Sequence, residues 1–118
     1  MHELSIALSL IEVIRDQAAT WTHARVERIH VQVGELSGIV PEALQSAFEI
    51  AREGTELSAA ELQLEEVPVT IACPRCLSSQ PAVAPGDLRC AACGTVATKV
   101  TGGREMELVA VEVDDEPR

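Results

Sequence analysis

The chain has 118 residues, of which 47% are hydrophobic, and its only aromatic residues are Trp21 and Phe48. This length fits one compact domain plus a small module, and the apolar content excludes a disordered chain. Nine basic against nineteen acidic residues give a net charge of −10. That charge disfavours nucleic acid as a general partner, because attraction to phosphates needs clustered Lys and Arg.

Apolar periodicity predicts a helix, a strand and a second helix in the first half of the chain. The helix runs to about Thr20, with Trp21 packed at its end. A strand begins at Arg25 and a second helix at Pro41, ending near Gly54. The residues expected to face the core are Leu4, Ala7, Leu8, Ile11, Ile14 and Ala18 of the first helix, Ile29, Val31 and Val33 of the strand, and Val40, Ala43, Leu44, Ala47, Phe48 and Ala51 of the second helix.

Two more strands are predicted in the second half of the chain. ELQLEEVPVTIAC, residues 61–73, alternates and leads as one strand into the first cysteine. EMELVAVEV, residues 105–113, is apolar on both faces, which favours a central strand. The expected fold class is α+β, a small three-stranded sheet with two helices plus an inserted zinc-ribbon-like module. We expect residues 1–71 and 105–118 to form the α+β domain and 72–104 to form the module.

The predicted module contains two cysteine pairs. Residues 73–93 read CPRCLSSQPAVAPGDLRCAAC, which is C-x2-C, thirteen residues, then C-x2-C. This spacing indicates a tetrahedral zinc site, and four sulfurs leave no position open for catalysis. A redox dithiol is the alternative, but two pairs at this spacing favour metal. The predicted zinc ligands are Cys73, Cys76, Cys90 and Cys93.

The first residues, MHE, offer a second set of metal ligands. The Met1 amine, the His2 amide and a His2 ring nitrogen can chelate one ion, with the fourth place left to the Glu3 amide, a water or a partner's donor. Nitrogen ligands in a plane suit Ni(II) or Cu(II). The chelate requires a retained Met1 with an unblocked amine. Otherwise His2 is an ordinary terminal residue and Glu3 an acid suited to a helix N-terminus.

The order of four motifs resembles one protein family over essentially the full length. MHELS, VGELSGIVPEAL at 33–44, the paired cysteines and EMELVAVEV resemble the nickel hydrogenase maturation proteins of the HypA/HybF family. The resemblance implies a nickel metallochaperone that serves nickel-iron hydrogenase and, in some members, urease. It implies Ni(II) bound by the Met1 amine, the His2 amide and ring and the Glu3 amide, with structural zinc at the four cysteines. The implied partners are a nickel-handling GTPase, the hydrogenase large subunit precursor and urease accessory proteins.

Other functions are weighed against this one. The net charge of +3 over residues 72–104 permits a zinc-ribbon nucleic-acid binder, but the −13 elsewhere and the scarcity of aromatics argue against it. A structural adaptor predicts that His2→Ala leaves function intact. No Ser/His/Asp order or phosphate loop indicates an enzyme, and we assign His23 and His30 no role.

The expected location is the cytoplasm. The chain opens without the positively charged start of a secretory signal, and no apolar run is long enough to span a membrane. Closely paired cysteines that bind metal also suit a reducing compartment. Both a monomer and a homodimer are compatible with the sequence.

Overall fold

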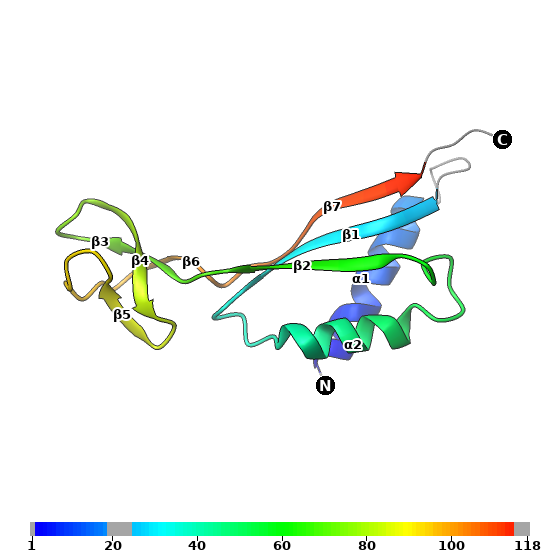
Figure 1. The fold of residues 1–118 in the computed structure, drawn as a ribbon, viewed down its shortest axis with the longest axis horizontal. Coiled ribbons are helices and arrows are strands. Elements are labelled where there is room, and N and C mark those ends of the chain that lie inside the picture. Colours follow the sequence, from blue (N-terminus) through cyan, green and yellow to red (C-terminus); the bar gives the residue numbers. More distant parts are fainter. Residues whose placement is uncertain (1, 19–24, 115–118) are drawn as a thin grey trace. The chain divides into compact units, whose positions relative to one another are not determined.

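The computed structural model describes residues 2–18 and 25–114, and these divide into two compact units. Unit 1 comprises the described residues within 1–31, 39–65 and 108–118, and unit 2 comprises 32–38 and 66–107. The elements in chain order are α1 (His2–Ala18), β1 (Arg25–Gly34), α2 (Pro41–Ala51), β2 (Glu61–Val67), β3 (Thr70–Cys73), β4 (Ser78–Ala84), β5 (Asp87–Cys90), β6 (Val100–Gly102) and β7 (Met106–Asp114) (Figure 1).

No helix among the described residues has the length and apolar character needed to cross a membrane. The predicted Trp21 plug and His23 lie outside the described residues.

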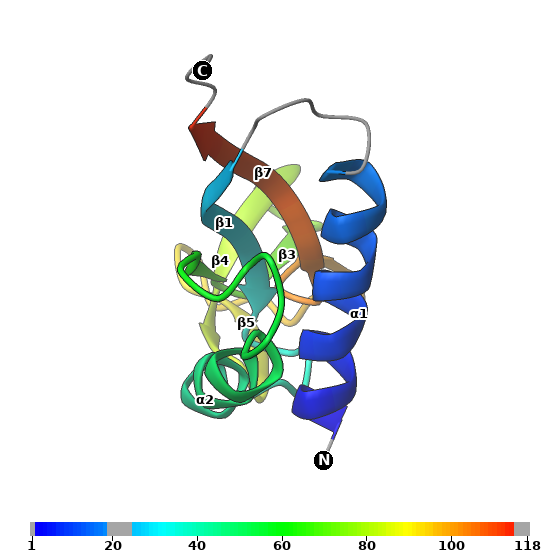
Figure 2. The same ribbon diagram turned by 90° about the vertical axis from the view of Figure 1, so that its right-hand side faces the viewer.

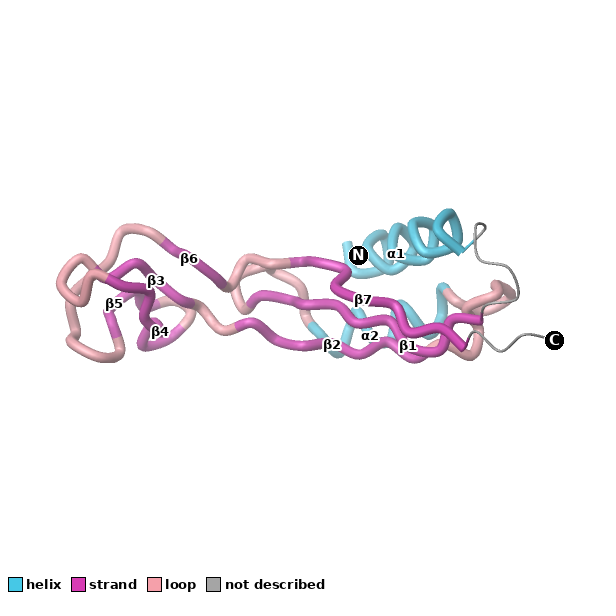
Figure 3. The backbone as a smooth tube through the Cα atoms, turned by 90° about the horizontal axis from the view of Figure 1, so that it is seen from above, coloured by secondary structure: helices cyan, strands magenta, loops and turns pink. Residues whose placement is uncertain are grey.

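A three-stranded sheet has the order β2-β1-β7. The strands β1 and β2 lie side by side (Figure 3). The Glu35 amide donates to the Val67 carbonyl at 3.0 Å, which puts the ends of the two strands together, so they run in the same direction. The Gly34 amide donates to the Glu105 carbonyl at 2.7 Å, which places the end of β1 beside the start of β7. β7 therefore runs antiparallel to β1.

The prediction that residues 105–113 form a central strand is wrong. Among the described strands β1 holds the central place of this sheet and β7 lies at an edge. Val109 and Val113 of β7 remain 55% and 37% exposed. An apolar pattern on both faces reflects the preference of valine for extended backbone, and it does not by itself show that both faces are covered.

The core of unit 1 lies between the two helices and β1. α1 and α2 pack against each other (Figure 2), and Leu44 and Phe48 of α2 are fully buried. Three predicted core residues are in solvent, because Leu8 and Val40 are each 52% exposed and Ala43 is also exposed. Leu10, which was not predicted to face the core, is buried. The buried face of α1 is therefore rotated slightly about the helix axis from the predicted face.

The predicted strand 61–73 is two strands. β2 belongs to the three-stranded sheet, whereas β3 belongs to a second sheet of four strands with the order β5-β4-β3-β6. The break contains Pro68, which has no amide hydrogen for a sheet ladder. The Val69 amide beyond it donates to the Glu35 carboxylate at 2.9 Å. The Glu35 side chain therefore accepts the hydrogen bond that a neighbouring strand would accept in a continuous sheet.

The segment VGELSG, residues 33–38, contacts the two stretches of unit 2 that connect the two sheets, residues 67–69 and 103–105. A Cβ atom on Gly34 would lie 2.1 Å from the Gly103 carbonyl oxygen, so only glycine fits there. The Leu36 amide donates to the same Gly103 carbonyl at 2.6 Å. The motif therefore holds residues 67–69 and 103–105 together through backbone contacts and the Glu35 carboxylate.

The four-stranded sheet of unit 2 is antiparallel in each of its pairings, and Cys73 of β3 is paired with Ser78 of β4. Its small core contains Ile71, Cys73, Cys90 and Ala97. Two of these four buried residues are predicted metal ligands, so little purely apolar material holds this unit together.

Candidate metal centres

The four cysteines converge in unit 2. Cys73 and Cys90 end β3 and β5 and are buried, whereas Cys76 and Cys93 lie in the turns that follow and are half-buried. All four sulfurs lie within 4.8 Å of one another, with Cys73–Cys93 at 3.5 Å and Cys76–Cys90 at 4.0 Å. Tetrahedral zinc with Zn–S bonds of about 2.3 Å needs sulfurs about 3.8 Å apart. The donor set and spacing therefore fit zinc.

The two turns have the same backbone pattern. The Leu77 amide donates to the Cys73 carbonyl at 2.9 Å, and the Gly94 amide donates to the Cys90 carbonyl at 2.8 Å. Both donors have positive φ, 57° at Leu77 and 80° at Gly94. Glycine adopts this conformation readily and leucine does not. The spacing of the cysteines did not reveal the unusual position of Leu77.

The thiols differ in acidity. Hydrogen bonding with the Thr95 hydroxyl and backbone lowers the pKa of Cys93 to about 6. Hydrogen bonding with Cys73 and Cys93 raises the pKa of Cys76 to about 12. Cys93 Sγ lies 3.3 Å from Thr95 Oγ1. Thr95 therefore acts on a ligand without being one, and only its place two residues after Cys93 hinted at this.

His2 and Glu3 form the first turn of α1. The His2 side chain is 62% exposed and the Glu3 side chain 14%, with 3.5 Å between Nε2 and Oε2. The Val40 amide donates to Glu3 Oε2 at 3.3 Å, and this bond lowers the pKa of Glu3. Glu3 thereby connects the start of α1 to the residue that precedes α2. Met1 lies outside the described residues.

His30, which was assigned no role, has charged partners on the sheet. Its Nε2 contacts Glu112 of β7, and Arg28 Nη1 donates to the same carboxylate at 3.0 Å. These bonds lower the pKa of Glu112. Among the described residues, the four cysteines are the only group of three or more His, Cys, Asp or Glu side chains close enough to share a metal ion. His30 therefore contributes to strand pairing.

The fold and the cysteine cluster define a class, a small α+β protein whose second unit is a zinc-ribbon-like metal-binding module. A family described as "Hydrogenase/urease nickel incorporation, metallochaperone, hypA" matches residues 1–113. The hydrogenase maturation factor HypA of Chloroflexus aurantiacus is 43% identical over 112 residues, which are 95% of this chain and 98% of that protein. HypA of Roseiflexus sp. is 42% identical over 98% of this chain and 94% of its own length.

Solved structures agree with this assignment. The solution structure of the Ni metallochaperone HypA from Helicobacter pylori superposes with a TM-score of 0.65 at 29% identity, over 97% of this chain and 98% of that one. A second solution structure of a HypA protein gives 0.72 at 30% identity, over 98% of each chain. The chain belongs to the HypA family of hydrogenase maturation metallochaperones.

Proposed function

We propose that this chain binds one Ni(II) at its N-terminus and delivers it for the maturation of nickel-iron hydrogenase. The nickel ligands are the Met1 amine, the His2 amide and ring, and the Glu3 amide. The observation that carries the proposal is that His2 and Glu3 open α1. The first four amides of a helix have no carbonyl acceptor within it, so a metal ion can take these nitrogens without breaking helical hydrogen bonds.

The same site allows nickel to leave. The exposed His2 ring is accessible to ligands of a receiving protein, and metal held by ionised amides is released when protons return. Glu3 stays fixed through its carboxylate to the Val40 amide, which leaves its own amide nitrogen in a constant position. Nickel is thus the cargo of this site and not a resident cofactor.

The remaining assignments follow the same proposal. Residues 1–71 and 105–118 form the nickel domain, and residues 72–104 form a module with structural zinc at Cys73, Cys76, Cys90 and Cys93. Zinc would supply rigidity there, because the unit has a small core. A nickel-handling GTPase and the hydrogenase large subunit precursor are the partners, with urease accessory proteins as a further client system. The proposed location is the cytoplasm, because paired metal-binding cysteines suit a reducing compartment.

A calorimetric titration with Ni(II) tests the nickel site. The zinc-loaded, untagged protein is compared with His2→Ala and with an N-terminally acetylated form, after mass spectrometry has confirmed Met1. We expect one strong binding event that both changes abolish, because each removes one of the nitrogen ligands. Equal binding by all three proteins would place nickel elsewhere in the chain.

Maturation assays separate a carrier from a structural adaptor. In cells that lack their own copy, His2→Ala should lower hydrogenase activity, and added nickel should partly restore it. Urease activity measured in the same cells shows whether urease is a client. Full hydrogenase activity with His2→Ala would favour the adaptor.

A further inference from the structure

Leu77 combines two unfavourable features at one position. It is 86% exposed, more than any other large hydrophobic residue described, and its φ is 57°. It is the only non-glycine residue with positive φ among residues 2–18 and 25–114. Glycine would relax this backbone and remove an apolar group from water. The turn after the first cysteine pair has the same backbone pattern as the turn at Gly94, so the turn itself sets this φ and holds an apolar side chain in solvent.

A positively charged residue precedes this leucine by two positions. Arg75 is two residues away and exposed, and no ion pair to it is found in the described part of the chain. Arg89 differs, because its Nε lies 2.9 and 3.0 Å from the two carboxylate oxygens of Asp87. Leu77 and Arg75 together, here called the cysteine-turn tip, therefore present an apolar group with an adjacent cation that remains available for a partner.

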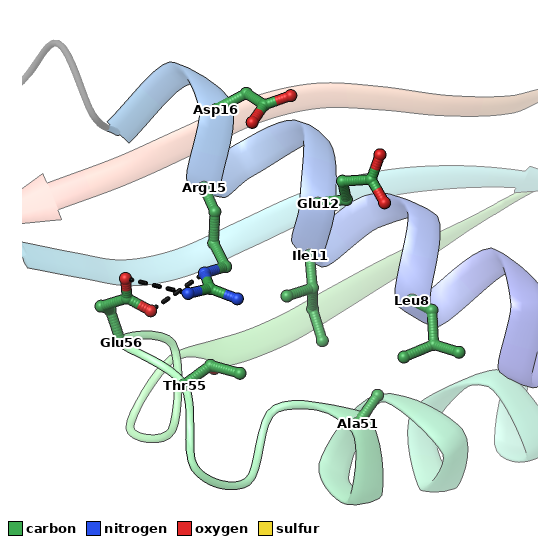
Figure 4. Close-up of a pocket in the computed structure, with 8 residues that line it drawn as sticks. All are labelled: Leu8, Ile11, Glu12, Arg15, Asp16, Ala51, Thr55 and Glu56. Carbon is green, nitrogen blue, oxygen red and sulfur yellow. Dashed lines mark hydrogen bonds and ion pairs between the residues drawn. The ribbon is translucent and has the colours of Figure 1, made fainter.

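Unit 1 carries a groove of matching chemistry. It lies between α1 and the end of α2 and has a volume of about 590 Å³. Leu8, Ile11 and Ala51 point into it, while Glu12 and Asp16 lie along its α1 side (Figure 4). Leu8 is 52% exposed, so apolar surface there is in water.

The charges at this groove favour a cation. Arg15 forms an ion pair with Glu56, with 2.9 Å between Nε and Oε1. Glu12 and Asp16 have no ion pair within the described ranges, so their two negative charges face solvent at the groove.

We propose that the cysteine-turn tip of one copy docks into the α1–α2 groove of a second copy. Leu77 enters the groove between Leu8 and Ala51, and Arg75 pairs with Glu12 or Asp16. The volume accommodates a leucine side chain with room for its neighbours. With a net charge of −10, copies repel one another unless local charges are complementary, so these pairs also set the orientation. The contact joins two different surfaces, so it is head-to-tail.

Sedimentation velocity of the zinc-loaded, nickel-free protein tests the contact across a range of concentrations. We expect reversible self-association that Leu77→Gly weakens about tenfold, the loss that corresponds to re-exposing a buried leucine. Val96→Ser is the matched control, since Val96 is also exposed on unit 2, at 64%, and should leave association unchanged. Zinc content and circular dichroism of each variant show that the fold is retained.

A charge exchange distinguishes this contact from other modes of association. Arg75→Glu and Glu12→Lys should each weaken association, because like charges then meet. An equimolar mixture of the two variants should restore it, since every head-to-tail contact between unlike copies again pairs opposite charges. A monomeric wild-type protein, equal losses with Leu77→Gly and Val96→Ser, or no recovery in the mixture would each overturn the proposal. The nickel measurements are independent of these outcomes.

Discussion

At the scale of single residues, the cysteine cluster shows how one neighbour changes the chemistry of a ligand. In the folded unit Thr95 lowers the pKa of Cys93 to about 6, which favours its thiolate at neutral pH. The thiolate is the metal-binding form. Cys93 therefore gives up its proton to zinc readily. Cys76, whose pKa is raised to about 12, depends on the metal to lose its proton.

Replacing Thr95 with valine should raise the pKa of Cys93 towards its usual value of 9.0. At pH 7 the affinity for zinc, measured by competition with a chelator, should then fall, because Cys93 must lose its proton at a greater free-energy cost before it binds the metal. Thr98→Val, at an exposed position of the same unit, is the control. Equal zinc affinities of wild type and Thr95→Val would contradict the assigned role of Thr95.

Glu112 provides a second prediction at this scale. Its pKa is lowered by His30 and Arg28, so the native state favours the charged form. The stabilisation is present above the ordinary glutamate pKa of 4.5 and is lost as the pH falls through the lowered value. Glu112→Gln should therefore lower the melting temperature at pH 7 slightly, and the difference from wild type should shrink as the pH falls below 4.5. Glu107→Gln, at an exposed position of the same strand, is the control substitution.

At the scale of elements, VGELSG determines where the first strand ends and how the neighbouring segments meet. The motif has the composition of a turn, and Gly38, with φ of 80°, is used as one. Gly34 has a different role, because it allows the Gly103 carbonyl to approach the backbone. Glu35 supplies the hydrogen bond that the chain loses beside Pro68. The segment is therefore a junction as well as a loop.

Gly34→Ala tests the junction. Because the added Cβ would lie 2.1 Å from a backbone oxygen, this change should lower the free energy of unfolding by at least about 2 kcal/mol. Gly86→Ala is the control, since no atom lies within 4 Å of a Cβ there and the change should be within about 0.5 kcal/mol. Denaturant unfolding of zinc-loaded protein measures both, and equal stabilities of the two variants would count against the junction.

At the scale of the whole molecule, the two units draw their stability from different sources. Unit 1 buries long apolar side chains, including Ile14, Ile29, Leu44 and Phe48. The buried cluster around the cysteines of unit 2 has four residues, two of them cysteines. Metal binding is then the main source of folding free energy for unit 2, as in other small metal-binding modules.

Removal of zinc should unfold unit 2 and leave unit 1 folded. Amide hydrogen exchange after treatment with a chelator should show loss of protection in β3, around Ile71, while Phe48 in α2 keeps its protection. Added zinc should restore β3. Simultaneous loss of protection in both elements would show that unit 1 also depends on the metal.

Much of this molecule follows from local patterns. Periodicity predicted α1, β1 and α2, and the spacing of the four cysteines predicted a cluster, because turns of two residues bring paired thiols together without regard to the remaining fold. The family followed from the order of motifs. Position 2 identified His2 as a candidate ligand, and its nickel role stays a prediction.

Only the tertiary structure placed β7 at an edge, separated β2 from β3, and left Leu8 in a groove. Each of these depends on which distant segments come together, and periodicity within one segment carries no information on its partner. The roles of Glu35 and Leu77 were hidden for the same reason. Their importance comes from the amide beyond Pro68 and from a positive φ, and neither is a property of the residue type.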